Sequence, residues 1–385
     1  MLTNIHNLDN YDYELEKKYI SSYPIEKRAD SKLLVYKNKK IIDSNFKQIS
    51  NYLPKDSTLF FNDSKVINGR LYFKNKNGAK IEILIADEKI SSALRKKSPL
   101  LLKVLIGNKK KWKGDDILEN KINGNTIKIK KIKNKVSFEW DNDISFDELL
   151  LKSGIIPLPP YINRDTESSD YLNYQTVYSK NKGSIAAPTA GLHFNNDLMN
   201  NLKRNQKVDF FTLHVGLGTF KPIKSENIQK HDMHSEEIII NRENILNIYN
   251  SKNITAVGTT SLRVLESIYY LGLIIENNKC NYEISQEIIK KKIRLNLKES
   301  CKKIINYFNS NNINKLKFNS KIFIYPGYSF KACDQLITNF HYPKSSLIIL
   351  IASFIGKDWR EVYKFAKEKN YRFLSYGDSS LLYRK

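Results

Sequence analysis

The second half of the chain alternates short apolar runs with helical stretches, and this alternation constrains the fold more than any other feature. From residue 208 onward we expect strands at 208–215, 254–257 and 321–325, and helices at 225–233, 262–271 and 346–354. Alternation of this kind favours a largely parallel sheet with crossover helices. The sequence therefore predicts a mixed, largely parallel α/β main domain, formed by residues 1–69 and 143–385.

Residues 70–142 have a different texture and interrupt that domain. Short alternating runs, such as those at 71–73, 81–85 and 126–129, are separated by turn-forming groups rich in Lys, Asn and Gly. Such spacing is typical of tight hairpins. We predict an inserted all-β domain here, and a capping box at Ser145 and Glu148 begins the helix that returns the chain to the main domain.

The composition is strongly basic. The 385 residues include 64 Lys and Arg against 40 Asp and Glu, which gives a formal net charge of +24. A polyanion such as RNA would suit this charge. Only 11 of the basic residues are Arg, however, and an AT-rich genome would also favour Lys, Asn and Ile. The charge alone leaves both explanations open.

The cysteines and the apolar runs bear on the compartment. Cys280, Cys301 and Cys333 show no paired metal-binding spacing, and such a set favours reduced thiols in a cytosol. The first residues lack the apolar core of a secretory signal. The longest apolar run, at 347–355, is far shorter than the roughly 20 residues that span a bilayer. We expect a cytoplasmic protein without a membrane partner.

Small residues, threonine and histidine gather in two motifs, at 183–194 and 211–220. Small residues let backbone amides approach a ligand closely, and glycine adopts backbone angles that other residues avoid. We therefore expect loops that line a ligand site. The second motif lacks the third glycine of a dinucleotide-binding fingerprint, so a Rossmann site is not favoured.

Several longer motifs follow in order along nearly the whole chain. They occupy residues 61–66, 156–162, 174–178, 231–236, 257–263, 338–345 and 371–378. With the two motifs above, they closely resemble the S-adenosylmethionine:tRNA ribosyltransferase-isomerases of the queuosine pathway. The chain departs from that family at Leu374, where phenylalanine is usual, and at Ser379 and Ser380, where alanine and methionine are usual. It is also longer at 273–320, which we expect to form a peripheral insertion.

The resemblance implies a defined reaction. These enzymes transfer the ribosyl part of S-adenosylmethionine to 7-aminomethyl-7-deazaguanine at the tRNA wobble position and isomerise it to epoxyqueuosine, releasing adenine and methionine. The implied partners are a tRNA with a GUN anticodon and S-adenosylmethionine, which is a co-substrate; no cofactor and no metal is implied. The resemblance also implies that the inserted domain at 70–142 is a small β-barrel. We expect a monomer.

Histidine supplies the first candidates for proton transfer, because its ordinary pKa lies close to neutrality. We expect catalytic roles for His193, His214, His234 and Asp63. His214 is favoured as the base, since it closes an apolar strand and opens a glycine-containing loop. Each candidate has a structural alternative: a histidine can be a packed core residue, and Asp63 can cap the turn that follows it.

Residues that bind S-adenosylmethionine are expected in the same motifs. Arg263 has a planar fork that matches a carboxylate, and the turn before it offers amide donors. Alternatively, Arg263 only pairs with Glu266 on one helix face. The full set of expected binding residues is Thr189, Gly191, Gly216, Gly218, Glu236, Thr259, Thr260, Arg263, His341 and Asp378.

Two other function classes stay open. A non-enzymatic RNA-binding protein would explain the charge. The basic run at 109–113 could meet RNA phosphates or form a solvated turn. Tyr161 and residues 174–178 suit a flipped nucleobase, but they suit an ordinary surface loop equally well. A metal-dependent hydrolase would use His231, His234 and Glu236 as zinc ligands. Adenine release from S-adenosylmethionine with precursor tRNA separates the first class from the enzyme, and stoichiometric zinc would reveal the second.

Overall fold

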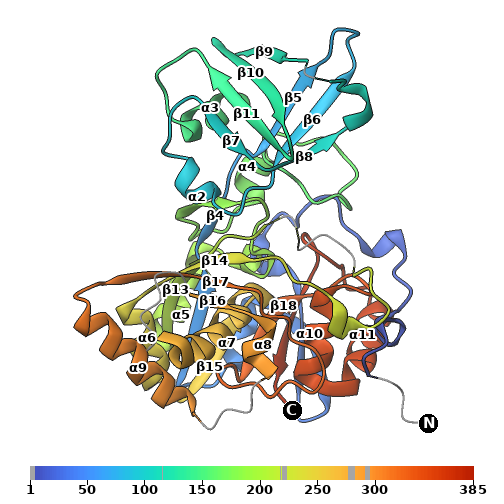
Figure 1. Cartoon of the computed structure of the whole chain (residues 1–385). Helices are drawn as coiled ribbons and strands as arrows, with labels where there is room; N and C mark the ends of the chain where they lie inside the picture. The colour runs from blue at the N-terminus through green and yellow to red at the C-terminus, as the bar shows by residue number, and fades with distance from the viewer. Residues whose placement is uncertain (1–4, 115, 217, 219–222, 276–281, 291–294) are drawn as a thin grey trace.

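The structure is a computed structural model that describes residues 5–114, 116–216, 218, 223–275, 282–290 and 295–385. Figure 1 shows a large α/β unit with a smaller β unit standing above it. Both chain termini lie in the larger unit. Cys280, which the sequence analysis counted among three thiols, lies outside the described residues, whereas Cys301 and Cys333 are free and buried.

A ten-stranded sheet forms the centre of the larger unit. In spatial order its strands are β16 (Glu283–Ile284), β17 (Lys315–Ser320), β14 (Glu236–Asn241), β13 (Lys207–Leu213), β3 (Ser57–Asn62), β15 (Asn253–Val257), β18 (Gln335–Asn339), β19 (Ser379–Tyr383), β1 (Lys32–Lys37) and β2 (Lys40–Asn45). β13, β3, β15 and β18 run parallel, while β14, β19 and β2 pair antiparallel with inner neighbours. The predicted mixed α/β sheet is confirmed.

Strand β3 shows why the centre of the sheet is parallel and covered on both faces. All of its residues are buried. Phe60 packs into the core under one face, whereas Leu59 and Phe61 pack into the core under the other. An apolar run without polar alternation is typical of a parallel strand with a layer on each side.

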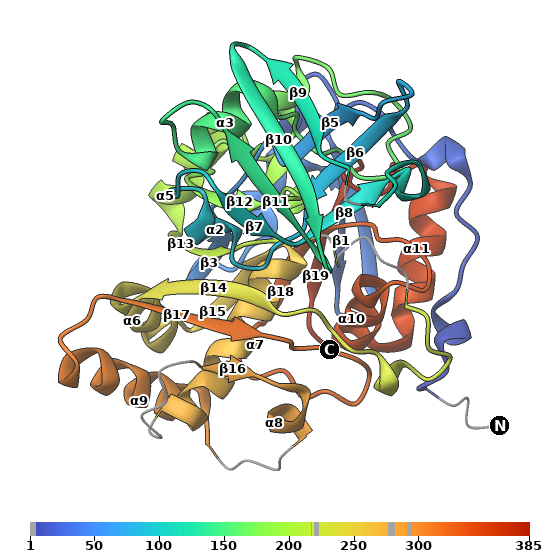
Figure 2. The ribbon, with the colours of Figure 1, turned by 45° about the horizontal axis from the view of Figure 1, so that its top comes forward.

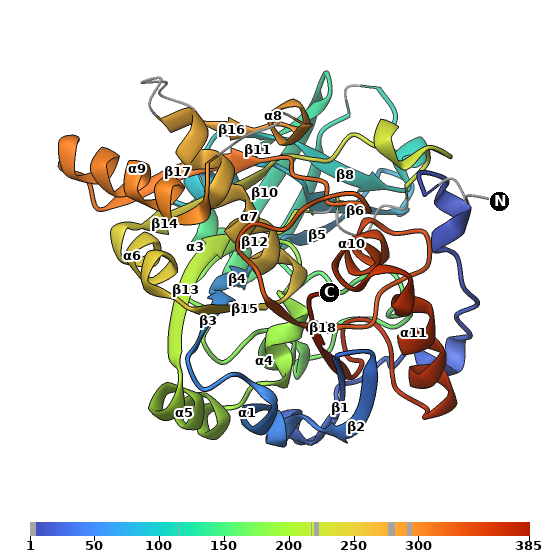
Figure 3. The ribbon, with the colours of Figure 1, turned by 90° about the horizontal axis from the view of Figure 1, so that it is seen from below.

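Helices supply those two layers. α7 (Thr259–Ile274) and α10 (Ser346–Ile355) bury their apolar residues in the larger core, together with α9 (Leu297–Ser310). α5 (Asn196–Asn205) and α1 (Ile49–Tyr52) contribute to the core on the opposite face. Figure 3 shows α5 and α1 on a different side of the sheet from α7 and α10. The expected helices at 262–271 and 346–354 are thus confirmed.

Residues 70–140 form two small sheets around one separate core. One contains β5 (Arg70–Lys74), β6 (Lys80–Ile85) and β8 (Val104–Gly107), and the other contains β7 (Leu100–Leu102), β11 (Lys135–Trp140), β10 (Asn125–Ile132) and β9 (Leu118–Ile122). Hairpin ladders join β5 to β6 and β10 to both of its neighbours. The β character of this segment is confirmed, but a closed barrel stays a prediction. The capping box predicted at Ser145 begins α3 (Phe146–Ser153).

Two predicted elements of the main domain are wrong. The expected helix at 225–233 is only a short 3-10 turn, Ile228–Lys230, because Asn227 accepts a hydrogen bond from the Gln229 amide and closes a local turn instead. The expected strand at 321–325 is buried but joins no sheet. The Phe323 amide donates to the Gln286 side chain, so a side chain replaces the neighbouring strand.

The segment expected to be a peripheral insertion, 273–320, has described parts that pack on the main domain. β17 pairs with β14 along its full length, and Cys301, Ile304 and Phe308 of α9 enter the larger core.

In the small β unit, Trp112 is also buried, and its indole donates to the Asp116 carbonyl. The basic run around Trp112 therefore offers no exposed aromatic ring for stacking on RNA.

Candidate active site

A cavity of about 380 Å³ lies where the central strands end. Its walls include Gly258 and Thr259 after β15, residues 339–343 after β18, the segment 186–190, and the tyrosines Tyr161 and Tyr174. The carboxyl ends of parallel strands are where open α/β sheets bind ligands. The volume falls within the range of small-molecule sites, roughly 300–1,000 Å³.

Helix α7 points its N-terminus into this cavity. Gly258 precedes the helix with φ of 91°, a backbone angle that favours glycine, and no side chain caps the first turn. Thr259 and Thr260 of that turn line the cavity. Unpaired amides and the helix dipole together make such an end suitable for an anionic group.

Buried polar atoms without partners surround the same turn. Among the described residues, Thr260 Oγ1 and Asn339 Oδ1, both from cavity-lining residues, make no hydrogen bond. Ser261 Oγ and Arg263 Nη2, on the same helix, also have none. Buried polar groups are nearly always paired, and leaving one unpaired costs roughly 1–3 kcal/mol. A polar ligand in the cavity would supply the missing partners.

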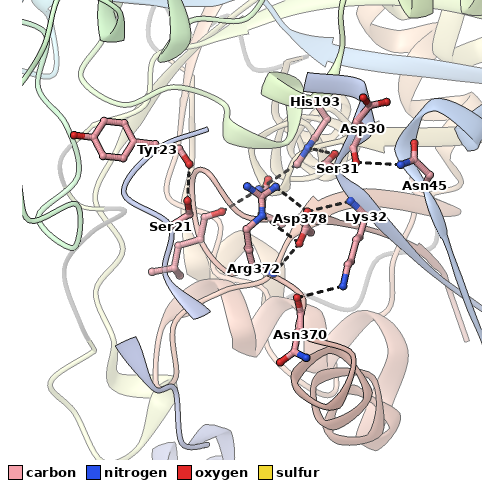
Figure 4. Close-up of polar contacts among 12 residues, drawn as sticks. Ser21, Tyr23, Asp30, Ser31, Lys32, Asn45, His193, Asn370, Arg372 and Asp378 are labelled. Atoms are coloured by element: carbon pink, nitrogen blue, oxygen red, sulfur yellow. Dashed lines mark hydrogen bonds and ion pairs between the residues drawn. The ribbon is translucent and has the colours of Figure 1, made fainter. Parts of the chain in front are cut away.

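His193 orients Asn339. The Asn339 amide nitrogen lies 3.2 Å from His193 Nε2 and also donates to the Leu374 carbonyl at 3.0 Å, while His193 Nδ1 lies 2.8 Å from Ser31 Oγ. Figure 4 shows His193 beside Ser31. Burial lowers the pKa of His193 to about 4, so the ring is neutral at pH 7. His193 therefore accepts from Asn339 and leaves the amide oxygen unpaired.

His341 belongs to the cavity wall itself. Its Nε2 lies 2.8 Å from Thr338 Oγ1, and its backbone amide donates to the Tyr363 hydroxyl. Burial lowers the pKa of His341 to about 3. A neutral ring held this way is suited to a hydrogen bond with a ligand, but it is a weak base.

Arg263 and Glu236 form a buried ion pair next to the cavity, and the half-buried His234 lies beside it. Arg263 Nη1 donates to Glu236 Oε2, and His234 Nε2 lies 3.1 Å from Glu236 Oε1. Burial opposes ionisation of Glu236, but Arg263 and His234 outweigh it and hold the pKa of this carboxyl below its usual value. Leu347 lies in the walls of both the main cavity and a smaller one lined by Arg263 and His234. The ion pair and His234 thus lie across one side chain from the main cavity.

The alternative pairing of Arg263 with Glu266 is wrong. Glu266 accepts hydrogen bonds from the backbone amides of Lys331, Ala332 and Cys333 at 2.9 to 3.1 Å and from the Tyr328 hydroxyl at 2.7 Å. Most of the Arg263 fork is also occupied, by Glu236 and by the Ile322 carbonyl. Only Nη2 stays available to a ligand.

His214 and Asp63 lie in a second, wider cavity of about 920 Å³. Asp63 accepts from Thr212 Oγ1 at 2.6 Å and from the Asn181 amide at 3.0 Å. Burial raises the pKa of Asp63. Val215 lines the first cavity, whereas the preceding His214 lines the second, so the two cavities flank the end of β13.

Hydrogen bonds around His214 bear on which ring nitrogen carries the proton. The Val215 amide donates to Ser184 Oγ, the hydroxyl oxygens of Ser184 and Ser64 lie 2.6 Å apart, and Ser64 Oγ lies 2.8 Å from His214 Nδ1. Donation from Ser184 to Ser64 and then to Nδ1 gives each hydroxyl hydrogen an acceptor. Burial lowers the pKa of His214 to about 4. With this direction of donation the neutral ring carries its proton on Nε2, whereas donation from Ser64 to the Asn181 carbonyl at 3.5 Å would place the proton on Nδ1.

The remaining expected residues either lie close to another site residue or hold parts of the fold together. A side chain at Gly218 would overlap His234, and one at Gly191 would overlap the Tyr178 hydroxyl, while Gly216 lies close to His234. The Asp378 carboxylate accepts from the backbone amides of Lys32 and Arg372 and from the Arg372 guanidinium (Figure 4). Asp378 therefore ties β1 to the C-terminal segment and is absent from the cavity lining.

Of the expected residues, the structure brings Thr189, Thr259, Thr260 and His341 together in the main cavity. Asn339 was not among the expected site residues, although it lies two positions before His341. The available signal was an amide at the end of a buried strand. Tyr161 and Tyr174 were left open between a base-binding role and a surface loop, and the structure places both in the cavity wall.

The described residues contain no group of three His, Cys, Asp or Glu side chains arranged to hold a metal ion. The ring of His231 packs edge-on against Phe323, with ring centroids 5.2 Å apart, while His234 pairs with Glu236. Likewise, no helix in the described parts of the chain is long and apolar enough to cross a bilayer.

Known proteins of one family match this chain along almost its full length. A family model described as queuosine biosynthesis protein matches residues 8–382. Proteins named S-adenosylmethionine:tRNA ribosyltransferase-isomerase from Vesicomyosocius okutanii and Rickettsia bellii are each 38% identical to this chain, over 97% and 98% of it and over 98% and 99% of their own lengths. One from Campylobacter jejuni is 36% identical over 97% of this chain and 98% of its own length.

A crystal structure of S-adenosylmethionine tRNA ribosyltransferase from Thermotoga maritima is 25% identical and covers 97% of this chain and 99% of its own, with a TM-score of 0.46. The family model and the named relatives match this chain by sequence, and these matches span both the large α/β unit and the small β unit. The chain belongs to the queuosine biosynthesis protein family.

Proposed function

We propose that this protein is an S-adenosylmethionine:tRNA ribosyltransferase-isomerase. It transfers the ribosyl part of S-adenosylmethionine to 7-aminomethyl-7-deazaguanine in tRNA and isomerises it to epoxyqueuosine, with release of adenine and methionine. The observation that carries this proposal is the match to relatives of that name along nearly the whole chain, which includes the residues that line the main cavity.

In this proposal S-adenosylmethionine binds in the main cavity. Its methionine carboxylate lies at the N-terminus of α7, where free amides and the helix dipole favour an anion. Thr260 Oγ1 and Asn339 Oδ1 gain the partners they lack. The rings of Tyr161 and Tyr342, with centroids 6.4 Å apart and planes inclined by 28°, offer aromatic faces to the adenine or to the incoming base.

His234 is the proposed base that removes the proton from the ribosyl carbon beside the sulfonium. A base works best when a second group orients it, and His234 pairs with the buried Glu236 carboxylate. His214 is the weaker candidate, because its Nδ1 already lies 2.8 Å from Ser64 Oγ and no carboxylate orients the ring among its described hydrogen bonds. His193 acts through Asn339 and is proposed as a positioning residue.

The finer expectations stay part of the proposal. The tRNA has a GUN anticodon, S-adenosylmethionine is the co-substrate without a further cofactor, and the protein is a cytoplasmic monomer. Residues 70–142 form an inserted barrel, and the insertion at 273–320 is peripheral to catalysis.

A product assay tests this function. The protein is incubated with S-adenosylmethionine and tRNA that carries 7-aminomethyl-7-deazaguanine, and adenine, methionine and epoxyqueuosine are measured. All three should appear in equal amounts, and unmodified tRNA should yield none. Folded protein that binds this tRNA but forms none of the three products would support the non-enzymatic RNA-binding alternative.

A further inference from the structure

The second cavity is a groove between the small β unit and the main sheet. Arg95 and the α3 residues Ser145 and Asp147 line one side, and Lys315 and Lys317 of β17 line the other. Lys180 and Lys182 lie on the segment that crosses between them. Figure 2 shows the small β unit above β14 and β17 at this junction. The groove is more than twice as large as the main cavity, at about 920 Å³ against 380 Å³.

The groove has an excess of positive charge. Its lining contains five cationic side chains and two carboxylates; the cations are Arg95, Lys180, Lys182, Lys315 and Lys317, and the carboxylates are Asp63 and Asp147. Lys182 pairs with Asp147 at 2.6 Å, and Lys317 lies 3.6 Å from Glu237. Among the described residues, Arg95, Lys180 and Lys315 have no carboxylate partner within ion-pair distance. These three cations are therefore available to an anionic ligand.

Two contacts between the units keep the groove formed without a ligand. Ser91 donates to the Glu237 carboxylate at 2.7 Å, which joins the small unit to β14. The Lys182–Asp147 pair joins the crossing segment to α3. His214, whose Nδ1 lies 2.8 Å from Ser64 Oγ, lies in the same lining. A ligand that accepts hydrogen bonds and carries several negative charges would meet donors on both walls.

We propose that this groove binds the phosphate backbone of the tRNA substrate and so delivers the modified base to the main cavity. The choice of RNA rests on the proposed function. A polyanionic strand fits the geometry better than one small anion, because the unpaired cations come from both units and from the segment between them. His214 and Val215 are adjacent in the chain but line different cavities, so a strand in the groove lies next to the proposed S-adenosylmethionine site.

Paired substitutions test the groove. The double variant Arg95→Gln/Lys315→Gln removes two unpaired cations from opposite walls. The matched control Lys203→Gln/Lys364→Gln removes the same charge from exposed positions on α5 and on α11 (Trp359–Glu368), away from the groove lining. Binding of the tRNA is measured for each protein at about 0.15 M salt and at several lower and higher salt concentrations. The KM for each substrate is measured as well.

The groove variant should bind tRNA at least about tenfold more weakly than the parent. Its salt dependence should be shallower, because with fewer phosphate contacts fewer counterions are released on binding. The KM for S-adenosylmethionine should stay unchanged, and the control should bind tRNA nearly as the parent does. Equal loss in both variants, or no loss in the groove variant, would overturn the proposal. Tight tRNA binding that depends on Arg95 and Lys315, in a protein that forms no product, would instead contradict the proposed function and leave the groove assignment standing.

Discussion

Two polar atoms in the cavity wall carry most of the ligand assignment at the scale of single residues. Thr260 Oγ1 and Asn339 Oδ1 are buried without partners, and Asn339 is held in that orientation by His193 and by the Leu374 carbonyl. Such atoms weaken the fold unless a ligand pairs with them. They therefore mark the places where hydrogen bonds to S-adenosylmethionine are expected.

Thr260→Val removes one of these atoms with little change in shape. We expect the dissociation constant for S-adenosylmethionine to rise about three- to tenfold, since one hydrogen bond contributes about 1 kcal/mol. The free energy of unfolding without ligand should stay equal or rise, because no existing hydrogen bond is lost. Thr255→Val is the control: its hydroxyl donates to Gln335 at 2.9 Å, so that variant should lose stability and keep its affinity. Unchanged affinity in Thr260→Val would contradict the placement of the ligand.

His234→Gln tests the proposed base. The variant should lose at least about a hundredfold in kcat while S-adenosylmethionine still binds, because general-base catalysis contributes 10²–10⁴-fold. His231→Gln is the matched control. His231 lies three residues before His234, and its ring packs against Phe323. If His234→Gln retains near-parental turnover, the base is another group, and His214 and Asp63 become the next candidates.

At the scale of elements, α7 connects the ligand site with the loop before β18. Its first turn faces the cavity, and two turns later Glu266 accepts three backbone amides from Lys331, Ala332 and Cys333. The carboxylate thus organises a segment that has no strand partners of its own. It fixes the path of the chain into β18, which ends at Asn339 and the cavity.

Glu266→Ala should destabilise the protein by roughly 3 kcal/mol or more, because it leaves several buried donors without an acceptor. Urea unfolding of the variant and the parent measures this change. The conservative variant Glu266→Gln should lose less, since the amide oxygen still accepts. A loss below about 1 kcal/mol in Glu266→Ala would show that water or other groups satisfy these amides.

The sequence predicted the elements whose apolar patterns are local, and missed those that depend on neighbours. β13, β15, α7 and α10 follow from their own residues. The run at 321–325 has the same apolar character as β15, but β18 already pairs with β15 and β19, so no sheet position adjoins it there. Thr259 and Thr260 were predicted as site residues because their motif follows the expected strand at 254–257. His341 was predicted because it lies in a motif that carries the family resemblance. The separation of His214 from them depends on which side of β13 each residue faces, and that requires the folded sheet.

At the scale of the whole molecule, buried neutral histidines make stability depend on pH. Burial lowers the pKa of His193 and of His214 to about 4, below the ordinary value of 6.5. The unfolded chain therefore takes up these protons first as the pH falls. The contribution of each histidine is fully present above pH 6.5 and is lost as the pH falls to about 4, and it amounts to roughly 3 kcal/mol each.

His193→Gln should reduce this acid sensitivity. Between pH 7 and pH 4.5 the free energy of unfolding of the parent should fall more steeply than that of the variant, as measured by urea unfolding at each pH. Lys203→Gln, on the exposed face of α5, should follow the parent curve. Parallel curves for parent and His193→Gln would contradict a lowered pKa for this ring.

The most direct test of the central claim follows the ribosyl carbons themselves. S-adenosylmethionine labelled with ¹³C in its ribosyl group is incubated with the protein and tRNA that carries 7-aminomethyl-7-deazaguanine, and the nucleosides of the recovered tRNA are analysed by mass spectrometry. The account predicts that all the ribosyl label enters the modified nucleoside as one adenine is released for each label transferred. Release of adenine with the label left in a small molecule would contradict it, because the protein would then cleave S-adenosylmethionine without modifying the tRNA.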